Sequence, residues 1–359
     1  MTTLKTIFYY SVMTGNRGDT AIRKAITEAI EENLNISFAY FNVKFEELTE
    51  ERIVNQLNTE SSCLIIAGSG LYTNYPKSSG WYFPCKTELF NKIKVPIFLV
   101  GLGCNNNLRK DMFNGILKDK AKISIQLINY LAKLSTVRDQ RTYDILKSIG
   151  INNHELMLDP ANFLKVPKVP KKKRVAINLA QHSPLLGRFD GGKEGQINRE
   201  KHLAYFLKVC KFLKMNDYQV VFIAHDALEQ SLIYDLKKKF NELEFINTDN
   251  IDEMLHEYAS CEFSIGMKMH SNILSFASGT PFISLYYDTK SPEYLKLIDW
   301  SDFGKPIFDL DFKWLKVRMA MLMANNAYYT KQFRNRKQIE QKPFDELIQK
   351  ICYTIKTTN

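Results

Sequence analysis

Short apolar runs alternate along this chain with amphipathic stretches, and this alternation constrains the fold more than any other feature. Residues 5–12, 62–70 and 95–103 have the character of buried strands, and the last two end in glycine turns. Residues 19–34 lie between strand-like runs and carry apolar side chains at helical spacing on one face. Strands that alternate with helices favour βα units built around parallel sheets.

A lysine- and proline-rich stretch at residues 165–174 divides this pattern into two halves. The alternation restarts at residues 174–180 and is more regular from there on. With 359 residues, the chain is long enough for two cores. We therefore predict two doubly wound α/β domains that face one another across a cleft, over residues 1–165 and 172–359, the second ending in a helical tail.

Composition and charge narrow the class of protein. The net charge of +10 is dispersed, and the chain carries no zinc-finger, RRM-like or KH-like signature, so we expect no nucleic-acid partner. No apolar run approaches the length of a membrane span, and the first residues do not resemble a secretory signal. We expect a cytoplasmic protein. The six cysteines form no CxxC pair, which predicts reduced, mainly buried thiols and no metal site.

Ligands of open parallel sheets bind beyond the carboxyl ends of the strands, and the first such loop is "TGNRGDTAI", residues 14–22. Gly15 and Gly18 allow a tight turn, and Asp19 or Thr20 is expected to cap the following helix. The free N–H groups of a helix N-terminus favour an anion. An ordinary capped turn is an equally good interpretation.

Two glycine turns follow later strands of the first half, "AGSG" with Gly68 and Gly70, and "GLGCNNN" at residues 101–107. Glycines at equivalent strand ends indicate a backbone that approaches a ligand closely. Tyr72 and further aromatic residues come directly after the first turn. Their rings could stack on a sugar, although packing in the core or at its rim is the commoner role.

Three further segments lie at turns or strand ends. Arg138 and Asp139 end one strand and begin a helix, where Asp139 could simply cap the helix and pair internally with the arginine. Asp159 precedes a proline in a typical turn. The long polar loop at residues 180–195 contains Arg188, and loops of this length are more often functional than structural.

The segment "GMKMHSNILSFASGTPFISLYYDTK", residues 266–290, places Lys268 and His270 between a strand and a short helix. Histidine titrates near neutral pH and can hold or pass a proton. Lysine is a point charge suited to phosphate or carboxylate. The competing interpretation is that His270 merely packs at the end of a buried strand.

Taken together, "GNRGDTAI", "VRDQRTYDILKSIG", "LDPA" and "MHSNILSFASGTPFISLYYDTK" resemble, in order and spacing, the polysaccharide pyruvyl transferase family over about residues 5–295. The resemblance implies two Rossmann-like domains in a GT-B-like arrangement. It also implies transfer of a pyruvyl group from phosphoenolpyruvate to two hydroxyls of one sugar, which forms a ketal on a cell-surface polysaccharide or its precursor. Phosphoenolpyruvate is then a co-substrate, and no cofactor is expected.

The resemblance implies a role for His270 directly, and we assign further roles from the ordered motifs and from the cations at strand ends. His270 would be the catalytic acid/base group. The donor phosphoenolpyruvate would bind on the side of the second domain, to Lys268, His270 and a second cation, either Arg188 or, from the first domain, Arg138. The acceptor sugar would bind on the first domain, to Asn16, Arg17, Gly18, Asp19, Gly68, Gly70 and Tyr72.

Two departures from the family pattern leave alternatives open. Lys268 stands where the family has arginine, so it keeps the charge but loses the bidentate fork. Ser69 interrupts a family glycine triplet between Gly68 and Gly70. The chain could instead be a GT-B glycosyltransferase that uses a nucleotide sugar, or a non-catalytic member of the family. Its basic surface is compatible with a lipid-linked acceptor and peripheral contact with the inner membrane face.

Overall fold

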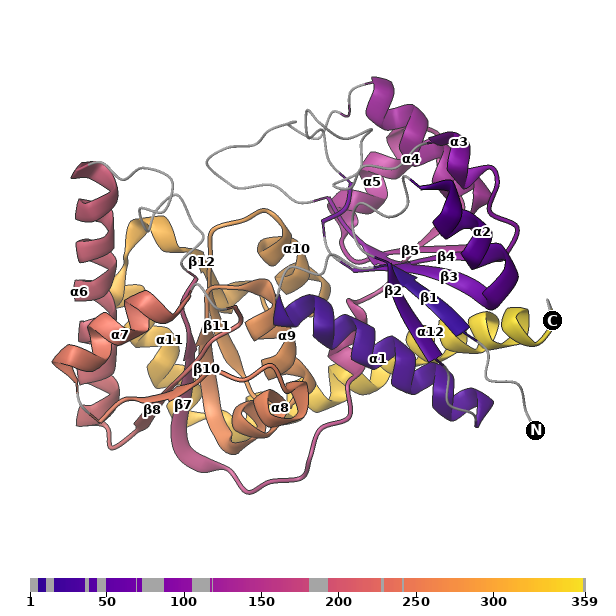
Figure 1. The fold of residues 1–359 in the computed structure, drawn as a ribbon. Helices are drawn as coiled ribbons and strands as arrows, with labels where there is room; N and C mark the ends of the chain where they lie inside the picture. The colour runs from indigo at the N-terminus through magenta and orange to yellow at the C-terminus, as the bar shows by residue number, and fades with distance from the viewer. Residues whose placement is uncertain are drawn as a thin grey trace.

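The computed structural model of the protein describes residues 6–10, 16–35, 39–43, 50–68, 70–72, 87–104, 117, 119–180, 193–226, 229–240 and 242–357. Within these residues the chain forms two six-stranded sheets, and every strand pair in both sheets is parallel. Figure 1 shows the two sheets side by side, with helices around each of them.

The first sheet contains strands β1 (Thr6–Tyr10), β2 (Ala39–Val43), β3 (Ser61–Ala67), β4 (Ile97–Leu102), β5 (Leu134–Val137) and β6 (His154–Leu156). The helices of this half are α1 (Arg17–Leu34), α2 (Glu51–Glu60), α3 (Thr87–Phe90), α4 (Asp119–Leu131), α5 (Gln140–Ser148) and the 3₁₀-helix η2 (Pro160–Phe163). Strand β4 is buried at every position, which explains why it appears in the sequence as an unbroken apolar run.

The second sheet contains strands β7 (Lys172–Asn178), β8 (Gln219–Ile223), β9 (Glu244–Ile246), β10 (Cys261–Gly266), β11 (Phe282–Tyr286) and β12 (Gly304–Pro306). Its helices are α6 (Lys193–Met215), α7 (Gln230–Lys239), α8 (Ile251–Ser260), α9 (Met269–Ala277), α10 (Lys290–Leu297), the 3₁₀-helices η5 (Ser301–Phe303) and η6 (Ile307–Asp309), α11 (Phe312–Ala324) and α12 (Asn326–Thr357).

The strand orders place the loops that can carry a site. The first sheet runs β2-β1-β3-β4-β5-β6 and the second β12-β11-β10-β7-β8-β9. The direction of chain progression reverses between β1 and β3 in the first sheet and between β7 and β10 in the second. Doubly wound sheets bind ligands at such switch points. This topology confirms the prediction of two Rossmann-like α/β domains.

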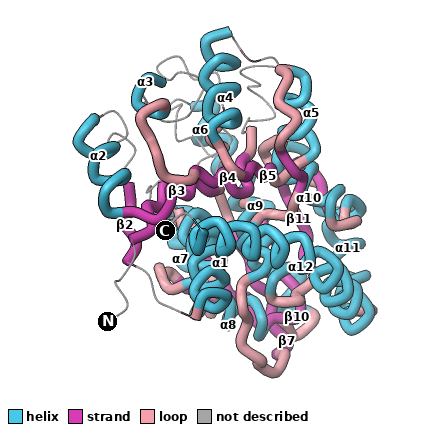
Figure 2. Tube along the Cα trace, turned by 90° about the vertical axis from the view of Figure 1, so that its right-hand side faces the viewer, coloured by secondary structure: helices cyan, strands magenta, loops and turns pink. Residues whose placement is uncertain are grey.

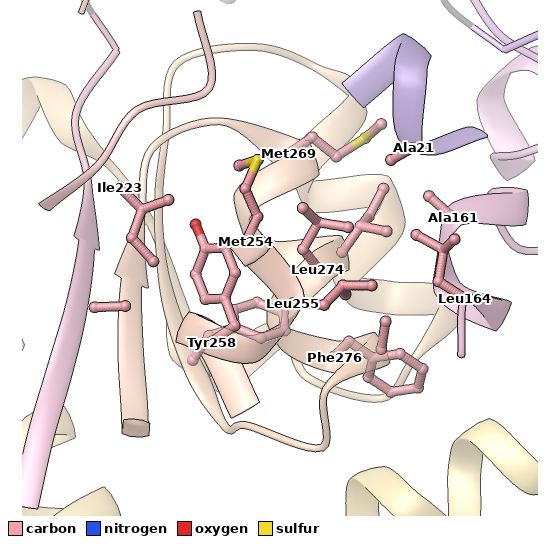
Figure 3. Packing of buried hydrophobic residues seen from close by; sticks show 14 of the residues in the cluster. Ala21, Ala161, Leu164, Ile223, Met254, Leu255, Tyr258, Met269, Leu274 and Phe276 are labelled. Carbon is pink, nitrogen blue, oxygen red and sulfur yellow. The ribbon is translucent and has the colours of Figure 1, made fainter. Parts of the chain in front are cut away.

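The apolar core does not stop at the boundary between the sheets. One cluster of buried side chains includes residues of α1 and η2 together with residues of α8 and α9. Figure 3 shows Ala21 of α1, and Ala161 and Leu164 near η2, on the side of α9 that carries Met269 and Leu274. Packing of this kind holds the N-terminal ends of α1 and α9 in a defined relation.

Helix α12 connects the two halves a second time. It follows the second sheet in the sequence but packs against α1 and η2 of the first half. Figure 1 shows it running beneath both sheets, and in Figure 2 it again lies beside α1. The helical tail that the sequence grouped with residues 172–359 therefore also contacts the first half. No helix of the described residues is long and apolar enough to cross a membrane.

Candidate active site

The N-terminus of α9 lies at the switch point of the second sheet. Strand β10 ends at Gly266, and α9 begins at Met269 after a two-residue connection. Asn178, at the end of the neighbouring strand β7, accepts hydrogen bonds from the backbone N–H of Met267 through its carbonyl oxygen (3.3 Å) and from that of Lys268 through Oδ1 (3.1 Å). These bonds fix the loop that presents His270 at the start of the helix.

His270 is buried and lies where the two domains meet. A Cβ atom added to Gly18 would lie 2.1 Å from Nδ1 of His270, so the first turn of α1 packs its bare backbone against the imidazole ring. On the other side, Nε2 lies 3.6 Å from Oδ2 of Asp159. This distance is too long for a hydrogen bond, and Nε2 has no hydrogen-bond partner among the described residues.

Asp159 is the centre of the charge network around His270. Its Oδ2 accepts a hydrogen bond from Nη1 of Arg138 at 2.8 Å, and its Oδ1 accepts one from the backbone N–H of Ala161. Burial alone would raise the pKa of this carboxyl, but the adjacent His270 and Arg138 together lower it. Asp159 therefore holds a negative charge beside the imidazole.

Asp19 places a second buried carboxyl near the same histidine. Burial raises the pKa of Asp19, and the positive charges of His270, Arg138 and Lys290 only partly oppose this effect. Its Oδ1 is buried without a hydrogen-bond partner in the described part of the chain. A carboxyl in this environment keeps its proton more readily than an exposed one.

Lys268 is engaged by two acidic side chains. Its Nζ lies 2.5 Å from Oδ2 of Asp226 and 2.7 Å from Oε1 of Glu229. Glu229 in turn accepts hydrogen bonds at Oε2 from Nδ2 of Asn178 (2.9 Å) and from the backbone N–H of His225 (2.6 Å). A donor contact by Lys268 would therefore require its ammonium to share or leave these carboxylates.

Arg17 extends from the first domain into the second. Its guanidinium donates to the carbonyl oxygen of Ala224 (3.0 Å), to Oδ1 of Asn247 (2.7 Å) and to Oδ1 of Asp249 (3.1 Å), while its backbone N–H donates to the carbonyl oxygen of His225 (3.2 Å). The acceptor role expected for Arg17 stays a prediction. In the structure its side chain fastens the two domains together beside His270.

The remaining expected acceptor residues have varied surroundings. Asn16 caps α1, accepting at Oδ1 from the N–H of Gly18, so the expectation that Asp19 or Thr20 caps this helix is wrong. The helix begins at Arg17, because the side chain of Asn16 satisfies the free N–H of Gly18 in its first turn. Gly68 has a positive φ of 67° and packs against Ile22 of α1.

Gly70 is half-buried after β3, and its acceptor role stays a prediction. Tyr72 is fully buried in the core of the first domain, where its hydroxyl accepts a hydrogen bond from Nδ2 of Asn129 at 3.2 Å. This is the packing role that the sequence left open for the aromatic residues. Arg188 lies outside the described residues.

The sequence indicated Asp159 only as a turn residue and predicted no site role for Lys290 or Asp226. Asp159 caps the 3₁₀-helix η2 as a turn residue would, and its other oxygen reaches Arg138. The one available signal was its position in the "LDPA" motif. Asp139 does cap α5, as one of the two sequence-based interpretations predicted. Arg138, however, pairs with Asp159 and not with the adjacent Asp139.

The arrangement can transfer protons and hold anions. In the described part of the chain, Nε2 of His270 has no hydrogen-bond partner, and the negative carboxylate of Asp159 lies 3.6 Å from it. Asp19 supplies a second proton-holding group. Arg138 and Lys290 contribute positive charge, and the capping residue of α9 makes no side-chain bond to the first N–H groups of the helix. An anion at this helix start would face these N–H groups.

The fold and the site together define a two-domain, Rossmann-like protein of the GT-B type whose switch-point loops converge on one histidine. The family model described as polysaccharide pyruvyl transferase matches residues 16–289 of this chain. The chain therefore belongs to the polysaccharide pyruvyl transferase family. A search of curated proteins gives no match.

Similar solved structures support the fold. The UDP-GlcNAc 2-epimerase of Neisseria meningitidis, bound to UDP-GlcNAc, has a TM-score of 0.56 at 11% identity, covering 95% of this chain and 99% of that chain. The UDP-GlcNAc 2-epimerase of Methanocaldococcus jannaschii has a TM-score of 0.55 at 12% identity, covering 89% and 93%. At such low identity the similarity concerns the fold alone.

Proposed function

We propose that the protein transfers a pyruvyl group from phosphoenolpyruvate to two hydroxyls of one sugar and so forms a ketal. The observation that carries the proposal is Nε2 of His270 in a chain of this family: it has no hydrogen-bond partner among the described residues and lies 3.6 Å from Oδ2 of Asp159, which pairs with Arg138. The sugar would belong to a cell-surface polysaccharide or to its precursor.

The reaction needs at least one group that both accepts and donates a proton. The first sugar hydroxyl attacks C2 of phosphoenolpyruvate and loses its proton, while C3 gains a proton and becomes a methyl group. The second hydroxyl then attacks C2 as the C2–O bond to phosphate breaks, and its proton leaves with the phosphate. His270 is suited to take the first proton and to deliver one to C3, a role that contributes about 10²–10⁴-fold in rate.

Binding of the donor requires compensation for a phosphate and a carboxylate. We assign this to Arg138, to Lys290, whose Nζ lies 3.5 Å from Oδ2 of Asp288, and to the N-terminal N–H groups of α9. Fixed donors and dipoles of this kind stabilise charge that develops as phosphate leaves. We assign the acceptor hydroxyl to Asp19, because this carboxyl belongs to the first domain and lies near His270.

The test is incubation of the full chain with phosphoenolpyruvate and a panel of saccharides, nucleotide-linked and lipid-linked sugars, followed by phosphate release and mass spectrometry. We expect phosphate release with addition of a pyruvate ketal mass. His270→Gln should lower turnover about 10²-fold or more, with little change in melting temperature. His256→Gln is the matched control, because that histidine is exposed on α8.

Thermal-shift measurements separate this proposal from the glycosyltransferase alternative. Phosphoenolpyruvate should raise the melting temperature as a ligand of the native state does. Stabilisation by a sugar nucleotide instead, with no ketal product across the panel, would reject the pyruvyl transfer. Absence of any donor binding by calorimetry would favour a non-catalytic family member.

A further inference from the structure

A cavity of about 660 Å³ lies away from His270, at the opposite end of α9. It is bounded by the linker between the two sheets, by the C-terminal end of α9 and by α12. The linker contributes residues 166–171, α9 and the turn after it contribute residues 276–279, and α12 contributes Arg334 and Lys337. We call this space the linker cavity. Its volume falls within the range of small-molecule sites.

The charged residues that line the linker cavity all have the same sign. Lys168, Lys171, Arg334 and Lys337 line it, and no aspartate or glutamate is among the lining residues of this described region. Like charges gathered without a counterion repel one another, and the repulsion is strongest where water is excluded. Such a cluster is stabilised when an anion enters it.

Two of these lysines are held on neutral oxygen atoms, so neither ammonium contacts a counterion among the residues that the structure describes. Lys171 Nζ donates to the carbonyl oxygen of Cys261 (2.6 Å) and to Oγ1 of Thr280 (2.5 Å). Lys337 Nζ donates to the carbonyl oxygens of Leu164 (3.0 Å) and Ala277 (2.9 Å). An ammonium has three N–H groups, so each lysine keeps one for a ligand.

The pKa values of these two lysines agree with missing counterions. Burial lowers the pKa of Lys171 to about 8, and the positive charge of Arg334 acts in the same direction. Burial likewise lowers the pKa of Lys337 to about 8. Glu262 opposes the shift at Lys171, but it does not line the cavity, and its Oε2 accepts a hydrogen bond from the hydroxyl of Tyr218.

The end of α9 does not require all of this positive charge. The carbonyl oxygens of Leu274, Ser275 and Phe276 already accept backbone hydrogen bonds from the turn that follows the helix. That of Ala277 accepts from Lys337. Capping of the helix end therefore explains Lys337 and leaves Lys168 and Arg334 unexplained.

Arg334 is the cation most available to a ligand. Within the described part of the chain its guanidinium has no hydrogen-bond or ion-pair partner, and neither has Lys168 across the cavity on the linker. The Arg334 side chain lies beside Gly279, where an added Cβ would be 3.6 Å from Nε. The five N–H donors of a guanidinium match the geometry of phosphate oxygens.

We propose that the linker cavity binds a compact polyanion, namely a phosphate or diphosphate group carried by a small, partly apolar ligand. Arg334 and Lys168 would contact the phosphate oxygens directly, and Lys171 and Lys337 would add their remaining N–H groups. The apolar lining from Val166, Val169 and Phe276 would accept the rest of the ligand. This site is separate from the proposed donor site and does not depend on pyruvyl transfer.

The experiment measures binding of inorganic pyrophosphate to the full chain by calorimetry, at constant ionic strength set with sodium chloride. We expect saturable binding in the wild type that is at least about tenfold weaker in Arg334→Gln and lost in Lys168→Gln/Arg334→Gln. Lys331→Gln is the matched control, because Lys331 is an exposed cation of the same helix outside the cavity lining. This variant should bind pyrophosphate as tightly as the wild type. Hydrogen exchange should show protection of residues 166–171 on addition of pyrophosphate.

The phosphate could come from a soluble compound or from a lipid headgroup, and a second measurement distinguishes these sources. Sedimentation with phosphatidylglycerol vesicles that depends on Arg334 and Lys168, and not on Lys331, would identify a lipid headgroup. Pyrophosphate binding with the same dependence, but no vesicle binding, would identify a soluble ligand. Equal pyrophosphate binding in the wild type and the double variant, or no saturable binding to either probe, would overturn the proposal.

Discussion

At the scale of single residues, the environment of Lys268 most sharply changes the view obtained from the sequence. A lysine two positions before a histidine is a natural anion ligand, yet its ammonium lies between Asp226 and Glu229. Removing one partner from a buried ion pair costs about 3–5 kcal/mol, because the other charge stays behind. Lys268 therefore supports the loop that holds His270. Its ammonium pairs with Glu229, Glu229 accepts a hydrogen bond from Nδ2 of Asn178, and Oδ1 of Asn178 accepts one from the backbone N–H of Lys268.

We predict that Lys268→Met lowers kcat for the proposed pyruvyl transfer more than it changes KM for phosphoenolpyruvate. Loss of the ammonium leaves two like charges together and loosens the start of α9. Lys268→Arg should restore much of the activity, since arginine keeps the charge. Steady-state kinetics with both variants check this, and Lys296→Met, at an exposed pair with Glu293, is the control.

The opposite kinetic pattern would assign Lys268 to the donor. A large rise in KM for phosphoenolpyruvate with kcat preserved would mean that the ammonium binds substrate anions directly. The positioning role would then be rejected, and the contact expected from the sequence would be correct.

At the scale of elements, the meeting of two helix N-termini builds the site. The first turn of α1 reaches His270 through Gly18, and the start of α9 carries that histidine. Glycine is needed at this position because a side chain would collide with the imidazole ring of His270. Its backbone conformation is not the reason, because the φ of Gly18 is not in the left-handed region. The sequence indicated a glycine turn here, but it placed the start of the helix at Asp19 or Thr20.

Gly18→Ala should abolish most activity while leaving the fold intact. Alanine favours a helix over glycine by about 1 kcal/mol, so the helix itself is not weakened. The added methyl group would displace the His270 ring, which lies only 2.1 Å from the Cβ position. Assays of turnover and melting temperature check this expectation. Asn33→Ala, at an exposed position near the end of the same helix, should behave as wild type; unchanged turnover in Gly18→Ala would show that the contact does not matter.

At the scale of the whole molecule, α12 and Arg17 join the domains on two sides. Arg17 binds three oxygen atoms of the second domain, and α12 packs against α1 and η2 of the first. Ionic contacts between α12 and the first half include Lys350 with Glu155 at 3.2 Å. Such ties explain why residues from both halves can share one buried site.

Phe344→Ala tests the contribution of α12. The ring of Phe344 stacks on Phe163 of η2 with centroids 4.7 Å apart, and we expect the variant to lose about 3–5 kcal/mol of unfolding free energy. Denaturant unfolding followed by fluorescence and circular dichroism measures the loss. Tyr353→Ala, on the same helix but 70% exposed, should cost far less. Equal losses in the two variants would mean that α12 does not secure the first domain.

The sequence by itself determined the alternation of strands and helices, the two Rossmann-like domains and the position of His270 at the start of a helix after a strand. These features depend on the local spacing of apolar residues and on turn residues, both of which the sequence contains directly. Only the tertiary structure decided the partners: Asp159 for Arg138, two carboxylates for Lys268, and the second domain for Arg17. The physical reason is that a buried charge is unfavourable unless it is paired or hydrogen-bonded. The identity of its partner depends on which distant segments of the chain pack together.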